Sequence, residues 1–364
     1  MRIFAGVRTL TWEQVYARRL AESRLDVRAP REELLEAACA TCGVHAQLAT
    51  GAELALSARV EEVTRDDVRD LLWQSRELIK ASTLRGTLHL HPVDDLPLWK
   101  SVRGVSTRWR EEFWLRWQEL TLVEAEQLRE VVLAALDDGE PRTRAEIGAA
   151  VGGRFGERIV ADSWGHYLAP AADLLCHGPP RGRNVTFVRC DRWLEGWFVL
   201  DADEALHEAC RRYLRTYAPV RRDELEHWLA ARLPDAAWSG LGLEEVDLEG
   251  FRTFVPAGMS FPDAKASGVR LLSHYDVYVI ACHPRDHLIP QHKERIFLRG
   301  AGPNPALLVD GRVAGVWRRE QRSRRMEIRV EPFRRLTNAQ RAELADDAAR
   351  VAYTYGAEPV LEIA

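Results

Sequence analysis

The sequence lacks a long hydrophobic segment. In its 364 residues no apolar run reaches the roughly 18 residues that a membrane-spanning helix needs. The first residues, Met1-Arg2-Ile3-Phe4, lead into charged sequence and not into the apolar core of a signal peptide. We therefore expect a cytoplasmic protein with no membrane partner.

Cysteine is sparse and scattered. Six cysteines, at positions 39, 42, 176, 190, 210 and 282, lack the dense spacing of a disulfide scaffold. Cys39 and Cys42 form a CxxC pair, but no second CxxC and no Cys/His pair at zinc-finger spacing accompanies it. We expect buried, reduced thiols and no metal site, with a zinc or redox pair as the alternative.

A net positive charge is also missing. The formal charge of −4 argues against a protein that coats nucleic acid indiscriminately, since such proteins gain most of their affinity by neutralising phosphates. Arginine is nevertheless concentrated locally, and such clusters are either solvated faces or phosphate contacts. Arg181 and Arg183 flank Gly182 in a turn, and a denser cluster contains Arg318, Arg319, Arg322, Arg324, Arg325, Arg329, Arg334 and Arg335.

The common catalytic signatures are absent. The sequence has no GxGxxG after a strand, no GxxxxGK[ST], no HExxH and no GxSxG. Nucleotide-binding, metalloprotease and GxSxG hydrolase functions therefore have no support, and we expect no cofactor.

What the sequence does contain is an approximate internal repeat of a helix, a short turn, a second helix and a β-hairpin. The second helix begins with a Thr/Arg-x-x-Asp/Glu pattern, which is typical of a capped helix start. Three copies are predicted: helices at 34–42 and 64–78 with a strand at 84–90; helices at 123–136 and from 143 with strands at 174–177 and 185–188; and helices at 205–217 and from 219 with strands at 243–248 and 251–255.

The pattern changes after residue 267. Short β-rich segments occur at 277–282, 306–309, 313–317 and 326–330, and Asp310-Gly311 is a strong hairpin signal. An amphipathic helix follows at 338–355, and we expect it to pack against the sheet. We predict an α+β protein of three tandem winged-helix units, at 1–120, 121–202 and 203–268, followed by a C-terminal β-barrel-like domain at 269–364.

A possible reactive centre lies in Gly43-Val44-His45-Ala46-Gln47. In an extended segment, residues two apart project from the same side, so His45 and Gln47 could hold one water or one sugar together. Without further context, a capping histidine and a surface glutamine are the better explanation of this tripeptide, because a His-x-Gln pair alone carries little information. Winged units favour DNA as the partner, although winged helices also mediate protein contacts.

Several motifs together resemble the winged-helix DNA glycosylase family typified by the azinomycin self-resistance glycosylase. The likeness covers nearly the whole chain. It rests on Leu10-Thr11-Trp12, Ala17-Arg18-Arg19-Leu20, the segment Gly43–Gln47, Arg85-Gly86-Thr87-Leu88-His89-Leu90, Leu271-Leu272-Ser273-His274-Tyr275-Asp276-Val277-Tyr278 and Leu308-Val309-Asp310-Gly311-Arg312-Val313-Ala314-Gly315-Val316-Trp317.

The resemblance implies excision of N7-alkylated purines from DNA. The family motif, usually Gln-x-Gln or Gln-x-Asp, falls on His45 and Gln47. Histidine at the first position resembles the subgroup associated with self-resistance to trioxacarcin-type antibiotics, which form bulky guanine adducts. The expected partner is double-stranded DNA that carries an alkylated purine, bound by a monomer.

The two side chains suit this chemistry. An N7-alkylated guanine is cationic and leaves as a neutral base, so the remaining task is to stabilise an oxocarbenium-like sugar and to position water. His45 can act as a general base, and Gln47 can hold the water or a sugar oxygen. The chain is poor in lysine, with Lys80, Lys100, Lys265 and Lys293 all outside the motif, so we expect a monofunctional enzyme that leaves an abasic site.

Further DNA contacts are expected from Arg85, His89, Arg181, Arg183, Arg318, Arg319 and Arg322, although His89 could equally be a structural histidine. Two other functions stay open. The first is a non-enzymatic DNA-binding protein, either a regulator or a protein that sequesters adducts. The second is a protein scaffold, which would bind DNA without salt sensitivity or not at all.

Overall fold

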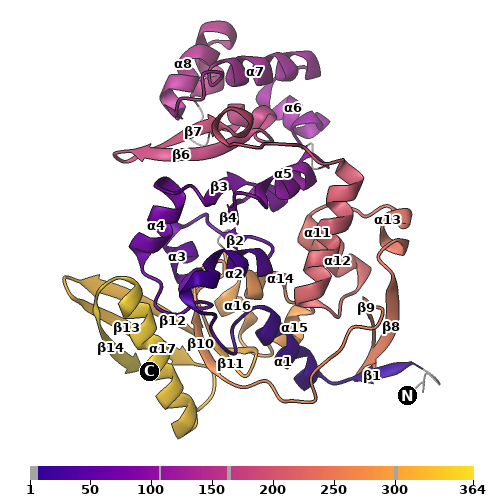
Figure 1. The fold of residues 1–364 in the computed structure, drawn as a ribbon, viewed down its shortest axis with the longest axis vertical. Helices are drawn as coiled ribbons and strands as arrows, with labels where there is room; N and C mark the ends of the chain where they lie inside the picture. Colours follow the sequence, from indigo (N-terminus) through magenta and orange to yellow (C-terminus); the bar gives the residue numbers. More distant parts are fainter. Residues whose placement is uncertain (1–6, 106–107, 162–164, 299–301) are drawn as a thin grey trace. The chain divides into compact units, whose positions relative to one another are not determined.

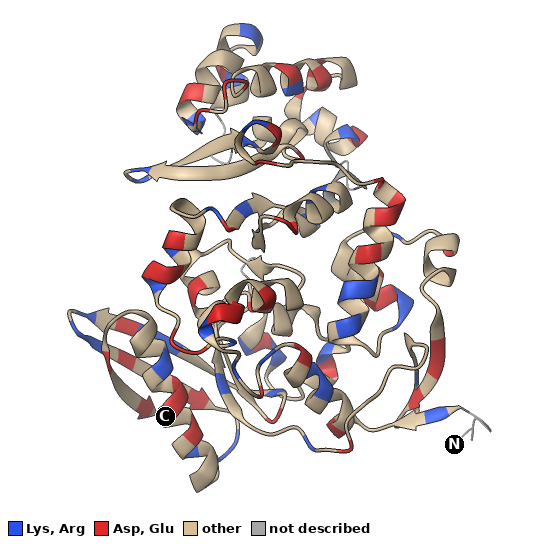
Figure 2. Ribbon diagram, in the orientation of Figure 1, with Lys and Arg blue, Asp and Glu red and all other residues tan. Residues whose placement is uncertain are grey.

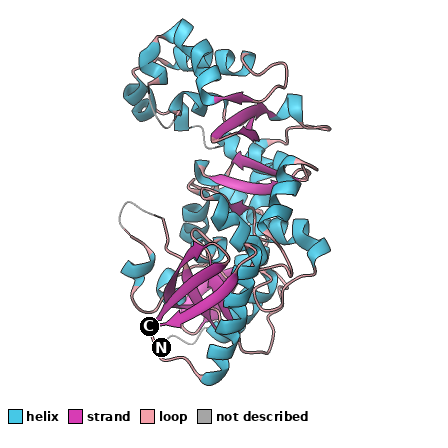
Figure 3. Cartoon of the chain, turned by 90° about the vertical axis from the view of Figure 1, so that its left-hand side faces the viewer, coloured by secondary structure: helices cyan, strands magenta, loops and turns pink. Residues whose placement is uncertain are grey.

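The computed structural model describes residues 7–105, 108–161, 165–298 and 302–364. Its contacts divide the chain into two compact units, one formed by residues 1–69 and 207–364 and the other by residues 70–206. Helices and strands alternate in both units, which confirms the expected α+β class (Figure 1, Figure 3). In these described ranges, no helix is both long and apolar enough to span a membrane.

The C-terminal part of the first unit is a five-stranded sheet that forms a half-barrel (Figure 3). Its pairs are antiparallel except for the last two strands, which run parallel, and the first and last strands form its edges. In spatial order the strands are β10 (Val269–Leu272), β11 (Ala306–Val309), β12 (Arg312–Arg322), β13 (Arg325–Pro332) and β14 (Glu358–Ile363).

The predicted hairpin at Asp310-Gly311 is confirmed. Val309 at the end of β11 pairs with Arg312 at the start of β12, and the two residues between them have φ values of 51° and 77°. Positive φ at both central positions is the condition that the Asp-Gly pair satisfies best. Gly311 is also required sterically, because a Cβ there would lie 2.7 Å from the Cβ of Tyr16.

Helix α17 (Asn338–Thr354) packs against this sheet, as the sequence predicts. Thr337 starts it with a capping box, in which Thr337 and Gln340 each accept a hydrogen bond from the other's backbone N–H. Leu344 and Val351 are fully buried against the apolar face of the sheet. Burial of each such side chain contributes about 1.5–3 kcal/mol.

Asp347 fastens α17 to its surroundings. Its carboxylate is 1% exposed and accepts hydrogen bonds from Arg28 at 2.5 Å, from Arg350 at 2.9 Å and from the backbone N–H of Leu271 at 2.7 Å. Burial by itself would raise the pKa of Asp347, but the charges of Arg350 and Arg28 outweigh burial and hold the pKa at about 2.

We expect Asp347→Asn to lower the free energy of unfolding at neutral pH by on the order of 2 kcal/mol. Because the folded pKa lies below the ordinary value, the carboxylate stabilises the fold fully above about pH 4 and loses this effect as the pH falls toward 2. Urea unfolding of both proteins at stepped pH values checks this. The difference between them should shrink on acidification, and a constant difference would contradict the assignment.

The rest of the first unit surrounds a buried arginine. Arg19 donates to the carbonyl oxygens of Tyr217 and Pro219 at 3.0 Å and of His283 at 2.8 Å, which ties the first helix to distant loops. The elements are β1 (Arg8–Leu10), α1 (Trp12–Glu22), α2 (Leu34–Ala40), β2 (Val44–His45), α3 (Ala49–Ser57), α11 (Ala202–Tyr217, entered from the second unit), α12 (Arg222–Leu229), α13 (Asp235–Ser239), β8 (Leu243–Leu248), β9 (Phe251–Pro256), α14 (Val277–Ala281), α15 (Arg285–Leu288) and α16 (Lys293–Ile296), with a 3₁₀ turn at Arg31–Glu33. Strands β8 and β9 form a hairpin, and β1 pairs in parallel with β8.

The second unit contains an antiparallel sheet and two apolar clusters. Lys100 is buried and donates to the carbonyl oxygens of Ser82, Ala172 and Leu175, which ties a helix to a strand and a loop. The elements are β3 (Leu78–Ser82), β4 (Leu88–Pro92), α5 (Leu96–Val105), α6 (Glu112–Gln118), α7 (Leu122–Ala134), β5 (Arg142–Thr143), α8 (Arg144–Phe155), α9 (Glu157–Val160), β6 (Leu175–Arg181), β7 (Asn184–Arg189) and α10 (Cys190–Trp193), with 3₁₀ turns at Leu84–Gly86, Arg108–Arg110 and His166–Ala171.

The strand expected at 277–282 is wrong, because this segment forms helix α14. The Asp276 side chain accepts a hydrogen bond from the backbone N–H of Tyr278 at 2.9 Å, which starts a helix. Four of the five helix residues are buried. A short, fully apolar run fits a buried helix as well as a buried strand, so periodicity could not separate the two.

The boundaries expected in the first repeat are also wrong. Thr64 and Asp67 form the predicted cap, but helix α4 (Arg65–Trp73) ends before residue 78, which instead begins strand β3. Arg76, with a φ of 61°, lies between them in a conformation that a helix cannot continue. The strand expected from residue 84 begins only at Leu88, because Arg85 and Gly86 have φ values of 57° and 72°.

Candidate active site

The His-x-Gln segment lies in the first unit, between α2 and α3. Cys42 and Gly43 turn the chain with φ values of 60° and 96°, and the two-residue strand β2 follows. His45 is 5% exposed, whereas Gln47 lies past the end of the strand and is exposed. The extended segment is therefore shorter than expected, and the two side chains differ in burial.

The backbone of Gln47 fixes one side of the His45 ring. Its N–H donates to Nδ1 of His45 at 3.5 Å, at the long limit of a hydrogen bond. A ring nitrogen that accepts an N–H carries no proton, so in this geometry the neutral imidazole has its proton on Nε2.

The face of the His45 ring lies against Tyr275. The ring centroids are 4.6 Å apart and the planes differ by 5°. The next residue, Asp276, forms a bidentate ion pair with Arg59 at 2.8 and 2.9 Å, and both side chains are at most 1% exposed. The loop that carries Tyr275 is thereby anchored in the core of the first unit.

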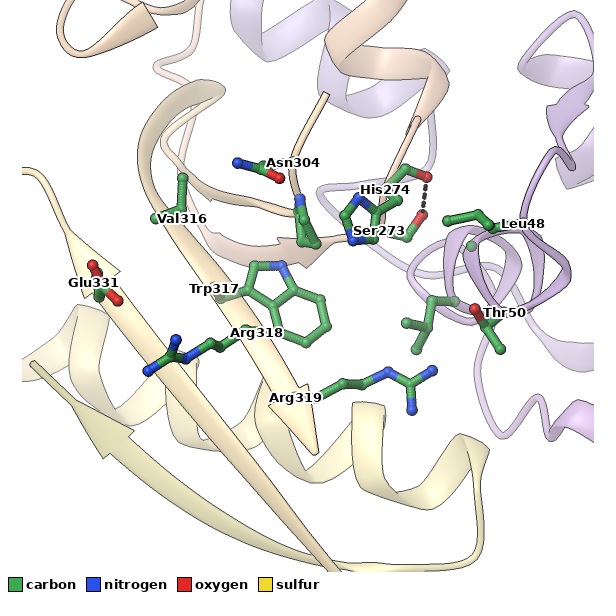
Figure 4. Close-up of a pocket in the computed structure, with 13 residues that line it drawn as sticks. Leu48, Thr50, Ser273, His274, Asn304, Val316, Trp317, Arg318, Arg319 and Glu331 are labelled. Carbon is green, nitrogen blue, oxygen red and sulfur yellow. Dashed lines mark hydrogen bonds between the residues drawn. The ribbon is translucent and has the colours of Figure 1, made fainter. Parts of the chain in front are cut away.

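A cavity of about 640 Å³ begins at Leu48, the residue after Gln47 (Figure 4). One wall comes from the start of α3 and the other from β12 and the loop before α14. Trp317 is held in place by its Nε1–H, which donates to the carbonyl oxygen of Leu272 at 2.8 Å. His274 donates from Nδ1 to the carbonyl oxygen of Pro303 at 3.3 Å, so its Nε2 is an acceptor.

Three arginines of the C-terminal cluster, Arg318, Arg319 and Arg322, were expected to contact DNA, and the first two line this cavity. Arg319 extends toward Thr50 and Arg318 toward Glu331 (Figure 4). The guanidinium of Arg319 also lies 4.1 Å from the centre of the Tyr355 ring, a cation–π distance. The cavity thus combines an aromatic wall with two cationic groups, an arrangement suited to an anionic or planar ligand.

Arg322 lies outside the cavity lining, near the turn between β12 and β13. It forms an exposed ion pair with Glu320 at 3.0 Å. Figure 2 shows further basic residues at this turn. Arg322 therefore belongs to the rim of the hairpin and not to the cavity.

Arg85 and His89 belong to the second unit and contact each other there. His89 donates from Nδ1 to the carbonyl oxygen of Thr87 at 3.1 Å, so its Nε2 can accept from Arg85, at 3.5 Å. The Thr83 hydroxyl lies 3.1 Å from Nδ1 of His89 and 3.0 Å from Nε2 of His91. His89 is buried in this network, beside the half-buried Arg85.

Arg181 and Arg183 flank the turn of the β6–β7 hairpin, as predicted (Figure 2). Gly182 has a φ of 60°, which suits a tight turn. Arg181 pairs with Glu146 at 2.7 Å, whereas Arg183 is exposed. A phosphate would have to compete with Glu146 for Arg181 but would meet Arg183 directly.

Five of the six cysteines are buried, as expected, and Cys39 is partly buried. In the part of the chain that the structure describes, no three His, Cys, Asp or Glu side chains gather as they would around a metal.

The sequence did not single out Tyr275, Arg59 or Trp317 as site residues. Tyr275 and Trp317 lie inside motifs on which the resemblance to the glycosylase family rests. The sequence therefore drew attention to these positions but assigned them no role. No sequence pattern pointed to Arg59, because its partner Asp276 is 217 residues away in the sequence.

We expect Arg318→Gln/Arg319→Gln to weaken binding to any DNA duplex. If both arginines contact phosphates, the slope of log K against log salt should fall by about 2, since each contact contributes about 0.9. Arg318 lies directly opposite Arg329 in the hairpin, a like-charge pair that a bound phosphate would relieve. Fluorescence anisotropy between about 50 and 200 mM salt measures the slope.

The matched control is Arg335→Gln, which removes one exposed charge outside the cavity lining. It should change the slope less than either cavity arginine. An unchanged slope in the double variant would show that the cavity arginines do not contact phosphate.

Comparisons with known proteins agree with the fold and the motifs. The family model described as DNA glycosylase AlkZ-like matches residues 39–353. The chain is similar to the interstrand DNA cross-link repair glycosylase of Streptomyces sahachiroi, with 29% identity over 335 residues, 84% of this chain and 87% of the relative. It is also similar to the solved structure of the Streptomyces sahachiroi DNA glycosylase AlkZ, with a TM-score of 0.85, 26% identity, and coverage of 98% of this chain and 100% of that one.

The motif resemblance seen in the sequence is thus confirmed by both a family model and a full-length structural match. The chain belongs to the AlkZ-like DNA glycosylase family and is a DNA glycosylase, a DNA-repair hydrolase that acts on N-glycosyl bonds.

Proposed function

We propose that this enzyme hydrolyses the N-glycosyl bond of an N7-alkylated guanine in double-stranded DNA and that His45 and Gln47 carry out the reaction. The observation that supports this most is the position of His45. Its ring is buried, lies against Tyr275 and accepts from the backbone N–H of Gln47, and an arginine-lined cavity begins at Leu48, the residue after Gln47.

The proposed step uses the charge that the lesion already carries. The bond between the sugar C1′ and N9 breaks, and its electron pair neutralises the cationic N7-alkylguanine. A water oxygen bonds to C1′, and the water proton passes to Nε2 of His45, giving an imidazolium and an abasic site. The Gln47 amide holds the water or a sugar oxygen in place.

This step requires the His45 tautomer with its proton on Nδ1. In the free protein, Nδ1 faces the N–H of Gln47 and is unprotonated. Giving up a hydrogen bond of this kind costs only about 0.5–1.5 kcal/mol, and at 3.5 Å this one is at the weak end. A change of tautomer on binding DNA therefore costs little free energy.

We propose a monofunctional reaction, with no lysine attacking the sugar. Lys265 and Lys293 pair with Glu13 and Asp286, and Lys100 is buried against backbone carbonyls. Lys80 is the lysine to test, because burial lowers its pKa, a property of lysines that form Schiff bases. Borohydride trapping of an enzyme–DNA adduct would overturn the monofunctional assignment.

We propose a bulky natural-product adduct as the physiological lesion, in antibiotic self-resistance. A cavity of about 640 Å³ with an aromatic wall has room for a group much larger than methyl. Because the Streptomyces sahachiroi relative is named an interstrand cross-link repair glycosylase, N7-linked interstrand crosslinks are a second substrate to test. Conversion of a crosslinked duplex to separable strands on a denaturing gel would be the positive result.

We further propose that the repeats are three winged-helix units, bounded at 1–120, 121–202 and 203–268, followed by the C-terminal domain at 269–364. The order of helix, helix and hairpin in α7, α8 and β6–β7, and again in α11, α12 and β8–β9, supports this. The enzyme is proposed to bind DNA as a monomer, with the wing arginines Arg181 and Arg183 and the half-buried Arg85 on phosphates.

The test is incubation with a duplex that contains one N7-alkylguanine, followed by heating in alkali. Strand cleavage at the lesion, with the alkylated base recovered in solution, is the expected result. Lesion-dependent binding without base release would instead support a sequestering protein. A sequence-specific footprint on unmodified DNA would support a regulator.

A further inference from the structure

The His45 ring has an aromatic neighbour that the proposed reaction does not use directly. Tyr275 lies in the loop between β10 and α14, and its ring is almost parallel to the imidazole, with 4.6 Å between centroids. Both residues belong to the first unit. The two rings are 230 positions apart in the sequence, so this contact is a product of the fold.

Tyr275 is itself held firmly. Its φ of 60° is unusual for a bulky residue and persists only where the surroundings enforce it. On one side of it, His274 donates to the carbonyl oxygen of Pro303. On the other side, Asp276 is paired with Arg59 and caps α14.

Gly302 closes the space around the Tyr275 ring. A Cβ at residue 302 would lie 1.8 Å from Cε1 and 2.0 Å from Cζ of Tyr275, closer than any real contact. The backbone there therefore approaches the ring in a way that only glycine permits. The tyrosine ring is confined by Gly302 as well as by the imidazole.

From these contacts we infer that Tyr275 is a positioning residue for His45, an inference that rests on the proposed catalytic role of that histidine. The stack fixes the plane of the imidazole in both tautomers, including the reactive one, in which Nδ1 carries the proton and no longer accepts from the Gln47 N–H. It therefore restricts the directions in which Nε2 can point. A general base must be held to within about 0.5 Å and 10–20° to act efficiently.

The stack also stabilises the positive charge that the His45 ring acquires during the reaction. When His45 takes the proton from water it becomes a cation over the π face of Tyr275, and this attraction is stronger than that of the neutral ring. An interaction that strengthens during the reaction raises kcat more than it lowers KM. Tyr275 is thus expected to affect the rate of base release more than the affinity for DNA.

The test compares Tyr275→Leu with Tyr275→Phe. The leucine variant removes the aromatic face, and single-turnover base release should fall by roughly 10- to 100-fold, the range for a misplaced catalytic group, with lesion-duplex affinity nearly unchanged. The phenylalanine variant keeps the face and should stay close to wild type. Equal rates for leucine and wild type, or equal losses in both variants, would overturn the inference.

A double-mutant cycle separates positioning from a structural effect. If Tyr275 acts through His45, then Tyr275→Leu should cause no further loss of rate in a His45→Ala background. A full additional loss there would show that Tyr275 acts independently of His45. If His45→Ala alone retains full activity, the proposed function fails, whereas a fully active Tyr275→Leu beside an inactive His45→Ala overturns only the present inference.

A spectroscopic measurement covers the case in which the leucine variant folds poorly. In wild type and Tyr275→Phe, the carbon-bound ring protons of His45 should show upfield NMR shifts from the aromatic face. The ¹⁵N shifts of the free protein should report the proton on Nε2. Unshifted ring protons in the wild type would show that the stack is absent in solution.

Discussion

Replacing His45 by alanine should slow single-turnover base release from an N7-alkylguanine duplex by about 10²- to 10⁴-fold, the contribution typical of a general base. Affinity for the lesion duplex should change little, because His45 is buried and the proposed phosphate contacts come from arginines elsewhere. The acidic limb of the pH–rate profile should also disappear, since only a neutral imidazole can accept the proton.

Two variants serve as controls for this result. His45→Gln gives the Gln-x-Gln motif that is usual in the family and should retain more activity than His45→Ala. Its pH–rate profile should lack the acidic limb. His292→Ala removes an exposed histidine that pairs with Glu294 and should behave as wild type. An undiminished rate in His45→Ala would mean that the base lies elsewhere.

The second large effect concerns stability. Asp276→Asn should lower the free energy of unfolding by about 3–5 kcal/mol, because it leaves the buried Arg59 guanidinium without its counter-charge. Guanidinium chloride unfolding, followed by circular dichroism at neutral pH, measures the loss. The size of the effect comes from the burial of both partners, which are at most 1% exposed.

The matched control removes both charges at once. Arg59→Met with Asp276→Leu leaves no unpaired charge and should recover most of the stability lost in Asp276→Asn. A loss in Asp276→Asn similar to that of an ordinary surface substitution would show that the pair is not buried in solution.

Local signals in the sequence predicted much of the fold. The Asp310-Gly311 hairpin and the amphipathic helix at 338–355 depend on residues within a few positions of one another. The hairpin is confirmed, and the helix is confirmed at Asn338–Thr354. The failures also have local causes. The apolar run after Asp276 had no periodicity that separates a helix from a strand. Arg76 and Arg85 adopt left-handed conformations that shifted the boundaries of neighbouring elements, and arginine is not a residue type that signals such a turn.

The candidate site was predictable only in part. His45 and Gln47 could be identified because the family motif falls on them, and Arg318 and Arg319 because arginine is concentrated there. The cavity that Arg318 and Arg319 line together with Leu48, the residue after Gln47, depends on how α3 packs beside the half-barrel. The stack of Tyr275 on His45 and the pairing of Arg59 with Asp276 bring together residues more than 200 positions apart, which no local pattern records.

The central claim is that His45 and Gln47 hydrolyse the N-glycosyl bond of an alkylated guanine. The most direct test is mass spectrometry of the base released by saturating protein from a duplex with one N7-alkylguanine, comparing wild type with His45→Ala/Gln47→Ala. Thermal unfolding and anisotropy first establish that the double variant folds and binds the same duplex. We predict that the wild type releases the alkylated guanine and the double variant does not, whereas equal release by the two proteins would contradict the claim.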